Sequence, residues 1–345
     1  MELSRAVLER AIARTDFLRA RRTEEPSKEW YHFCVHGDGL DLLVNLSVMD
    51  LAWEGSSALQ RLGRLVLVCE HRGRWHGEVE TFPAEALWLP SGSVGLGVGD
   101  HRVEFTDGRF RVRAALPRQG LALDLTFVPT TLPAWVPNVP LEDGPPLQWL
   151  LVPRMLAFGT VTVEGRPLRL EGVPAYHDHN WGVFRWGQDF AWEWGFGLAR
   201  NLDDPWSCVF VRLTDRARLR ARVQALMVWR GGVQYRLLRD QALTVTREGR
   251  LGPRRIPRFP RVAGLLTAEG ASDVPQRFRV GAREGADHVD LTFEPSSVAC
   301  VAVPDETALT LTRIHEVNGP LTLRGSLKGE AVRFDGRGFF EFLTP

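Results

Sequence analysis

The sequence predicts an all-β protein in which one N-terminal helix precedes two tandem β-barrel or sandwich domains. From Trp30 onward, short apolar stretches alternate with Gly, Pro and Asp turns, which is the pattern of strands joined in hairpins. Several stretches also recur at one nearly constant offset along the chain. Finally, the 345 residues of the chain exceed the size at which a single core usually stops growing, so two domains are expected.

The first 24 residues are expected to form the helix. Apolar side chains recur there at helical spacing while arginines occupy the other side, the apolar positions being Leu3, Val7, Leu8, Ala11 and Ile12. Because Glu2 and Glu9 are mixed among the arginines, we favour a helix that caps one end of a barrel over a membrane-surface anchor.

Internal repeats give the domain organisation. The stretch RFRVRA at 109–114 recurs as RFRVGA at 277–282, and DLTFVP at 124–129 recurs as DLTFEP at 290–295, with offsets of 168 and 166 residues. Glu29 and Trp30 recur as Glu193 and Trp194, and the closing strands correspond more loosely, with Tyr176 matched to Phe340. These matches predict a helix over 1–24, a first β domain over 25–188 and a second over 189–345.

Composition excludes several functional classes. A net charge of +1 gives no general attraction to nucleic acid. Four cysteines lie far apart in the sequence, at Cys34, Cys69, Cys208 and Cys300, which fits buried thiols in a reducing cytoplasm better than disulfides. No segment resembles a signal peptide or is long enough to span a bilayer. We therefore expect a cytoplasmic protein with no nucleic-acid partner and no integral membrane association, and peripheral membrane contact and oligomeric state stay open.

One segment concentrates chemical side chains. The stretch AYHDHNWG at 175–182 closes the first copy, whereas the second copy closes with GRGFFEFL. Since side chains alternate across a strand, His177, His179 and Trp181 are predicted to share one face. Tyr176, Asp178 and Asn180 are then on the other face. Residues added to only one of two copies indicate function better than residues that both copies need.

Metal binding is the competing interpretation of the two histidines, because an i, i+2 pair can chelate zinc or iron. A third ligand is required, and the remaining histidines are scattered without a second patterned motif. The sequence therefore predicts no metal and no cofactor.

Three stretches resemble, in the same order, landmarks of the carotenoid 1,2-hydratase and AttH-like proteins: EWYHF at 29–33, YHDHNWG at 176–182 and GRGFFEF at 336–342. That family is built from two lipocalin-like (calycin) β domains and is similar to enzymes that hydrate or cyclise isoprenoids and to fungal Diels-Alderase-type pericyclases. The resemblance implies this fold here and assigns His179 and Trp181 to the site, with Asp178 as a neighbour. The hydratase pattern has a Tyr and an Asp on the strand soon after the motif. The strand SCVFVRLTD at 207–215 has only Asp215, which disfavours carotenoid hydration itself.

The expected function is a hydratase or cyclase of secondary or isoprenoid metabolism that acts on a hydrophobic polyene, terpenoid or polyketide in a pocket at the domain junction. The candidate proton-transfer residues are Asp178, His179 and His177, and the candidate substrate-binding residues are Tyr176, Trp181 and Trp186. Burial among indoles would keep an aspartic acid protonated, and ring faces would stabilise a carbocation. A pericyclase would need mainly a shaped pocket and one hydrogen-bond donor. A non-catalytic carrier of a hydrophobic ligand is the alternative.

Overall fold

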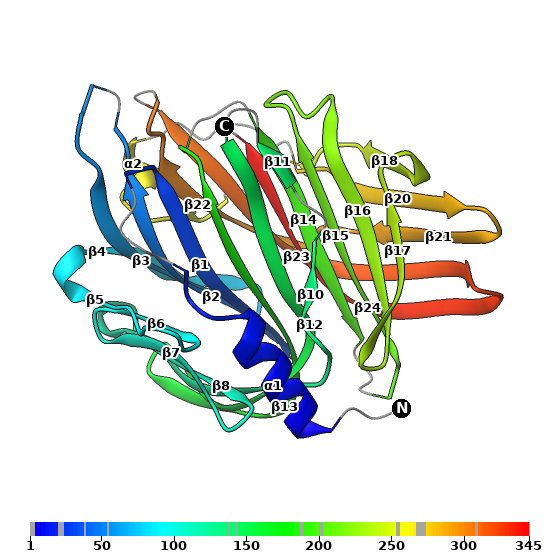
Figure 1. Cartoon of the computed structure of the whole chain (residues 1–345), viewed down its shortest axis with the longest axis horizontal. Helices are drawn as coiled ribbons and strands as arrows, with labels where there is room; N and C mark the ends of the chain where they lie inside the picture. The colour runs from blue at the N-terminus through cyan, green and yellow to red at the C-terminus, as the bar shows by residue number, and fades with distance from the viewer. Residues whose placement is uncertain are drawn as a thin grey trace. The chain divides into compact units, whose positions relative to one another are not determined.

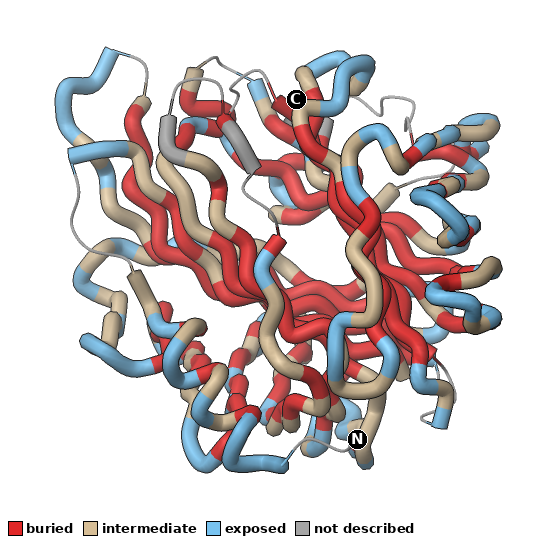
Figure 2. Tube along the Cα trace, turned by 45° about the vertical axis from the view of Figure 1, so that its right-hand side comes forward, coloured by how far each residue is buried: buried red, intermediate tan, exposed pale blue. Residues whose placement is uncertain are grey.

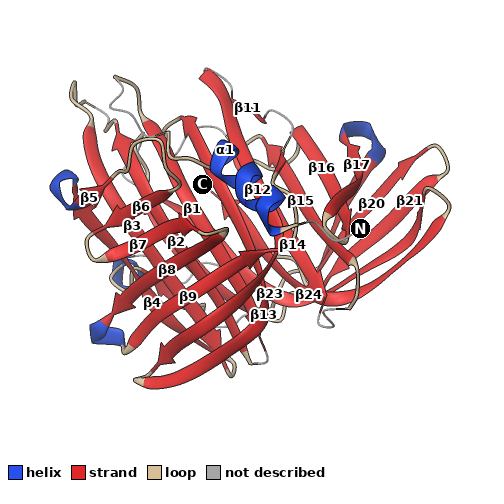
Figure 3. Cartoon of the chain, turned by 60° about the horizontal axis from the view of Figure 1, so that its bottom comes forward, coloured by secondary structure: helices blue, strands red, loops and turns tan. Residues whose placement is uncertain are grey.

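The structure is a computed structural model, and it describes residues 4–19, 24–37, 39–53, 55–136, 139–141, 144–186, 190–199, 203–252, 256–266, 274–307 and 310–344. Most of this described chain is strand (Figure 3). The predicted all-β class with an N-terminal helix is confirmed. Among the described residues, no helix has the length and apolar character that a bilayer span requires.

Two compact units divide the chain. Unit 1 consists of residues 1–188 and 305–310, and unit 2 consists of residues 189–304 and 311–345. The domain boundary expected at 188/189 lies outside the described residues.

Unit 1 is built on one antiparallel sheet with the strand order β4-β3-β2-β1-β13-β12-β9-β8-β7-β6-β5, and β10 and β11 also pair with β12 (Figure 1). The strands are β1 (Ser27–Gly37), β2 (Leu40–Leu51), β3 (Gln60–His71), β4 (Arg74–Pro83), β5 (Leu87–Trp88), β6 (Gly95–Val98), β7 (His101–Thr106), β8 (Arg109–Leu116), β9 (Leu121–Pro129), β10 (Ala134–Trp135), β11 (Val139–Leu141), β12 (Gly144–Val163) and β13 (Arg166–Val183). Two short 3-10 turns, η1 (Ala84–Ala86) and η2 (Pro117–Gln119), join strands. Because β6 and β7 contact β2 and β3, the sheet curls around an interior.

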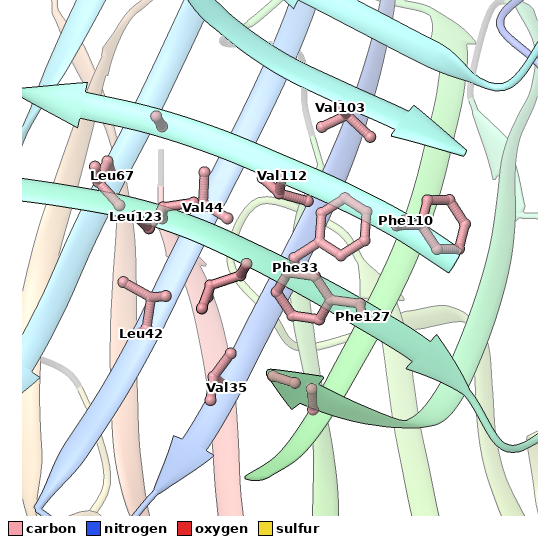
Figure 4. Close-up of a cluster of buried hydrophobic side chains, with 14 of the residues drawn as sticks. Phe33, Val35, Leu42, Val44, Leu67, Val103, Phe110, Val112, Leu123 and Phe127 are labelled. Carbon is pink, nitrogen blue, oxygen red and sulfur yellow. The ribbon is translucent and has the colours of Figure 1, made fainter. Parts of the chain in front are cut away.

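Apolar side chains fill this interior. On β8 and β9 the buried positions alternate with less buried ones, as expected for a sheet with one face on a core. Phe33 of β1 packs against Phe110 of β8 and Phe127 of β9, with ring centroids 5.3 and 4.9 Å apart (Figure 4). On β2 and β3, long stretches of consecutive residues are buried (Figure 2).

The N-terminal helix α1 spans Arg5–Thr15 and lies close to β8 and β13 (Figure 1). Leu8 and Ile12 are buried, and Ile12 belongs to the unit 1 core. The helix is shorter than the expected 1–24. It ends at Thr15, and the segment Asp16–Arg19 is not helical. The reason is that Asp16 turns its carboxylate toward β13, as described below.

Unit 2 repeats this plan with the strand order β17-β16-β15-β14-β24-β23-β21-β20-β18, and β22 pairs with β23 and β19. Its elements are β14 (Ala191–Ala199), β15 (Trp206–Thr214), β16 (Ala221–Arg230), β17 (Val233–Arg239), η3 (Asp240–Ala242), β18 (Leu243–Glu248), β19 (Arg258–Phe259), α2 (Ala263–Leu266), β20 (Arg277–Glu284), β21 (Asp287–Phe293), β22 (Ser297–Pro304), β23 (Leu311–Leu327) and β24 (Glu330–Thr344). A separate apolar core fills this unit.

The register of the two closing strands corrects one sequence match. In unit 1, His179 of β13 lies opposite Tyr31 of β1. In unit 2, Phe340 of β24 lies opposite Gly195 of β14. Since Glu29 and Glu193 occupy the same position in the two copies, Phe340 is the counterpart of His179 and not of Tyr176.

Candidate acid–base site

The candidate site lies where β1 and β13 pair inside unit 1. Tyr31 is opposite His179 and Phe33 is opposite His177. All four side chains are fully buried. Their rings stack in pairs, Tyr31 on His179 at 4.2 Å and Phe33 on His177 at 4.1 Å between centroids. The strand alternation predicted from the sequence therefore places both histidines on the face that points into the unit 1 core.

Asp16, which directly follows α1, joins the two histidines. Its Oδ2 lies 2.9 Å from His177 Nε2, and its Oδ1 lies 2.7 Å from His179 Nδ1. The main-chain oxygen of Asp16 accepts a hydrogen bond from the Tyr31 hydroxyl at 2.7 Å. These bonds hold the end of α1 against the two central strands of the sheet.

Glu29 extends the cluster on the far side of His179. Its Oε1 lies 2.7 Å from His179 Nε2 and accepts the main-chain N–H of Arg19 at 2.7 Å. The other nitrogen of His177, Nδ1, lies 2.9 Å from the main-chain oxygen of His32. Both ring nitrogens of each histidine therefore face oxygen acceptors.

This geometry favours the protonated form of His179, because both of its ring nitrogens face carboxylate oxygens and a neutral imidazole carries only one N–H donor. Burial lowers the pKa of His179, but its bonds to Asp16 and Glu29 outweigh burial and raise that pKa above the ordinary value. Burial raises the pKa of Asp16, but the two histidines outweigh it and the pKa is lowered overall. The bonds to Asp16 and Glu29 therefore favour an imidazolium at His179.

Trp181 marks the side of the cluster nearest to solvent. It lies opposite Glu29 in the strand register and is half-buried. The Arg19 guanidinium lies 3.7 Å from the centroid of its ring. Trp135, which is 44% exposed, packs edge-on against Trp181 at 5.3 Å. An aromatic and cationic surface thus adjoins the Glu29–His179 pair.

Asp178 lies on the opposite face of β13. Its Oδ2 accepts the Tyr176 hydroxyl at 3.0 Å and its Oδ1 accepts the Asn180 amide at 2.6 Å. Burial raises the pKa of Asp178 to about 7, against the lowering effects of His177 and of hydrogen bonds from Trp149, Tyr176 and Asn180. Asp178 and His179 therefore cannot meet the same atom of one ligand.

Trp186, the remaining predicted substrate-binding residue, is buried beyond the end of β13. It packs edge-on against Phe184 at 5.3 Å, and its main-chain N–H donates to Glu306 at 2.7 Å. The structure does not bring it together with the histidine cluster.

The two histidines contact Asp16 and Glu29 directly, at 2.7–2.9 Å between nitrogen and oxygen. Among the described residues, no group of His, Cys, Asp and Glu is arranged to hold a metal ion. A hollow of about 400 Å³ lies elsewhere on unit 1, lined by polar residues such as Arg5, Arg109 and Arg111. The hydrophobic cavity expected beside the motif strand stays a prediction.

Sequence reasoning missed Asp16 and Glu29. Because Glu29 recurs as Glu193 in the second copy, the repeat indicates a structural carboxylate and gives no sign of a chemical role. In unit 2 Glu193 binds Arg212 and Arg247, whereas in unit 1 Glu29 faces an imidazole. Glu29 could have been identified by its position opposite Trp181 of the motif strand. The recurrence of a glutamate in both copies does not identify it.

Unit 2 shows that the fold does not require this cluster. At the positions of Tyr31 and His179 it has Gly195 and Phe340. The Phe340 ring covers the glycine so closely that an added Cβ would lie 2.4 Å from it. An apolar pair therefore fills the same place in the same architecture.

Fold and site together define a protein of two lipocalin-like β units, the first of which holds a buried imidazole–carboxylate cluster. No protein-family profile matches this sequence, and no curated protein matches it. Solved structures do share the fold. A protein assigned as AttH from Nitrosomonas europaea has a TM-score of 0.66 at 15% identity, covering 96% of this chain and 97% of that one.

Two further solved structures are similar over most of their length. Kievitone hydratase from Nectria haematococca has a TM-score of 0.59 at 14% identity, covering 92% of this chain and 89% of the hydratase. CghA, solved with Sch210972, has a TM-score of 0.57 at 12% identity, covering 93% of this chain and 89% of CghA. The resemblance to the AttH-like proteins is thereby confirmed at the level of the fold.

Proposed function

We propose that this protein is an acid–base enzyme of the hydratase or cyclase kind that acts on an apolar, unsaturated small molecule. The observation that carries the proposal is the Asp16–His179–Glu29 cluster of unit 1, at whose central position unit 2 has Phe340. Burying charged groups is costly, and apolar residues can often replace a complete buried ion pair without loss of stability, so the presence of the cluster in one copy alone favours a chemical role. Kievitone hydratase shares the fold, which supports this kind of reaction.

The proposed proton path runs from His179 to Glu29. The Glu29 carboxyl is the member of the pair nearest the exposed edge, opposite Trp181. Glu29, resupplied from the imidazolium of His179, gives a proton to one carbon of a double bond, and the carbocation forms at the other carbon. The face of the Trp181 ring that Arg19 does not cover stabilises such a cation by about 2 kcal/mol when it is desolvated.

Two outcomes complete the reaction with balanced atoms. In hydration, the oxygen of a water molecule bonds to the cationic carbon and one water proton returns to Glu29. In cyclisation, a second double bond closes the ring, and Glu29 and His179 take back a proton from the neighbouring carbon. Arg19, beside Trp181, is positioned to hold a polar group of the substrate.

Asp178 is the second candidate acid, because its pKa of about 7 leaves it partly protonated near neutrality. It serves the other face of β13, so His179 and Asp178 are alternatives for any one substrate. The variants His179→Gln and Asp178→Asn separate them, since each keeps the size of the side chain and removes its acid–base function.

The test incubates the pure protein in D₂O with kievitone, lycopene and geranylgeraniol and follows the products by mass spectrometry. Hydration adds one water, and cyclisation changes retention without a change in formula. Acid catalysis also places one deuterium on carbon. We expect His179→Gln to slow turnover about 100-fold or more and Asp178→Asn to slow it little. Binding without any product, across these probes, would replace the enzyme proposal with a carrier.

A further inference from the structure

Unit 2 contains a pair of carboxyl groups on the face of its sheet that points away from its own core. Glu316 of β23 lies opposite Glu341 of β24, and Glu341 lies opposite Trp194 of β14. The neighbours Val317 and Phe340 point into the unit 2 core, so Glu316 and Glu341 share the other face. Glu316 is only 3% exposed.

Asn318 provides an independent observation at the same place. It follows Glu316 by two residues on β23, so both side chains are on one face. Its side chain is fully buried, and neither its Nδ2 nor its Oδ1 has a hydrogen-bond partner within the described part of the chain. The Oε2 of Glu316 likewise has no partner there. Buried polar groups in proteins are nearly always hydrogen-bonded, so these atoms need a partner that the described residues do not supply.

Aromatic rings surround the three polar residues. Phe339 lies opposite Asn318 and stacks on Phe196 with centroids 6.0 Å apart. The indole of Trp192 donates to Glu341 Oε2 at 3.1 Å. The polar atoms therefore stand as a small group within an apolar and aromatic surface, which is the pattern of a site that orients a mostly apolar ligand.

We propose that Glu316, Glu341 and Asn318 form a binding site in unit 2 for the hydroxyl or carbonyl oxygen of an otherwise apolar, unsaturated molecule. Glu316 is buried and lies opposite the like charge of Glu341, and both conditions disfavour its ionised form. Burial, followed by the charge of Glu341, raises the pKa of Glu316 well above its ordinary value. A protonated Glu316 offers an O–H donor, and the Asn318 amide offers both donors and an acceptor. The site thus selects a neutral oxygen group and disfavours a carboxylate.

The test compares farnesol with farnesene, its hydrocarbon counterpart, by calorimetric titration of the full chain. We expect wild type to bind farnesol about tenfold more tightly than farnesene, as one buried hydrogen-bonding group provides. Asn318→Leu and Glu316→Leu should bring the two affinities together without weakening farnesene binding. Glu316→Gln, which keeps a neutral donor, should retain the preference.

Gln224→Leu is the matched control, because it removes a unit 2 amide whose partners are main-chain oxygens, and it should leave the preference unchanged. If a leucine variant does not fold, Asn318→Ala decides the question in the same assay. Equal affinities in wild type, or a preference that survives Asn318→Leu, would mean that ordered water alone satisfies these groups and would overturn the proposal. The readout is binding and the residues belong to unit 2, so this result is separate from the success or failure of the proposed unit 1 chemistry.

Discussion

Asp16 is the residue on which the unit 1 cluster depends. It is fully buried and lies within 2.9 Å of one nitrogen of each histidine. Removing one partner of a buried charge pair leaves the other partner charged and without compensation, which is strongly destabilising. Asp16 therefore has a structural role in addition to its place in the acid–base cluster.

The first prediction is that Asp16→Asn lowers the free energy of unfolding by about 3–5 kcal/mol, measured by urea denaturation at neutral pH. The control is Asp124→Asn, which breaks an exposed pair with Arg111 and should cost less than about 1 kcal/mol. Because the pKa of Asp16 is lowered in the folded protein, its contribution is present above the unfolded pKa. The contribution disappears as the pH falls through the folded value. Equal stability of the two variants would contradict the assignment.

A second prediction concerns Asp178, whose pKa of about 7 in the folded protein lies above the ordinary value for an aspartic acid. The folded state therefore holds this proton more tightly than the unfolded state. The stability that comes from the neutral acid is fully present below the unfolded pKa and is lost as pH rises toward 7, by up to about 4 kcal/mol. Asp178→Asn should flatten the pH dependence of unfolding between about pH 4 and 7. A slope equal to that of wild type would show that Asp178 ionises normally.

For single residues, the sequence predicted which side chains of the motif strand share a face. It did not predict that Asp16 and Glu29 contact the histidines. Alternation along β13 follows from local geometry, so the separation of His177 and His179 from Asp178 could be predicted. The contact between Asp16 and His177 joins residues 161 positions apart. The sequence around Asp16 contains no pattern that predicts this contact. Glu29 could not be singled out because the same residue type recurs as Glu193. The residue type alone does not show that Glu29 contacts an imidazole whereas Glu193 contacts two arginines.

Among the secondary-structure elements, helix α1 connects the cluster to the core of unit 1, because Asp16 directly follows it and Ile12 packs in the core. One side of it is buried in the core through Ile12, while Val7 is 49% exposed. The hydrophobic periodicity of the sequence correctly predicted that Leu8 and Ile12 face the core, but it also put Val7 on the apolar side, and there it was wrong. The helix end at Thr15 could not be predicted, because the sequence shows no glycine or proline stop signal there and the carboxylate of Asp16 ends the helix through tertiary bonds.

The third prediction is that Ile12→Ala lowers the free energy of unfolding by about 2–5 kcal/mol, because it leaves a cavity in the core. Val7→Ala on the exposed side of the same helix should change it by less than about 0.5 kcal/mol. Thermal and chemical denaturation of both variants provide the measurement. If Ile12→Ala were as mild as Val7→Ala, α1 would not be seated in the unit 1 core.

For the whole molecule, the sequence repeats correctly predicted that the two β units share a strand plan. They did not predict that the segment Asp305–Thr310 belongs to unit 1. Within it, Glu306 lies 2.7 Å from Lys28, and both side chains are fully buried. Burial lowers the pKa of Lys28 to about 8 even though Glu306 raises it. Lys28 and Glu306 are far apart in the sequence, so no local sequence pattern predicts that they form an ion pair.

The fourth prediction is that Glu306→Leu alone costs about 3–5 kcal/mol of unfolding free energy, since Lys28 is then a buried charge without a carboxylate. The double variant Lys28→Met with Glu306→Leu should recover part of this loss, because an apolar pair replaces the ion pair, while the main-chain N–H groups of Ala52 and Trp186 still lose their acceptor. A double-mutant cycle by urea denaturation measures the coupling. Additive losses in the cycle would mean that the two residues do not interact in solution.

The central claim is that the imidazole of His179 takes part in proton transfer. Its most direct test is kcat/KM of His179→Gln on the first substrate found to turn over, compared with His36→Gln. The control removes another buried histidine of unit 1 that is paired with a carboxylate, Asp41. The account predicts a loss of about 100-fold or more for His179→Gln in a folded protein and near wild-type activity for His36→Gln. Near wild-type activity of both variants would contradict the claim.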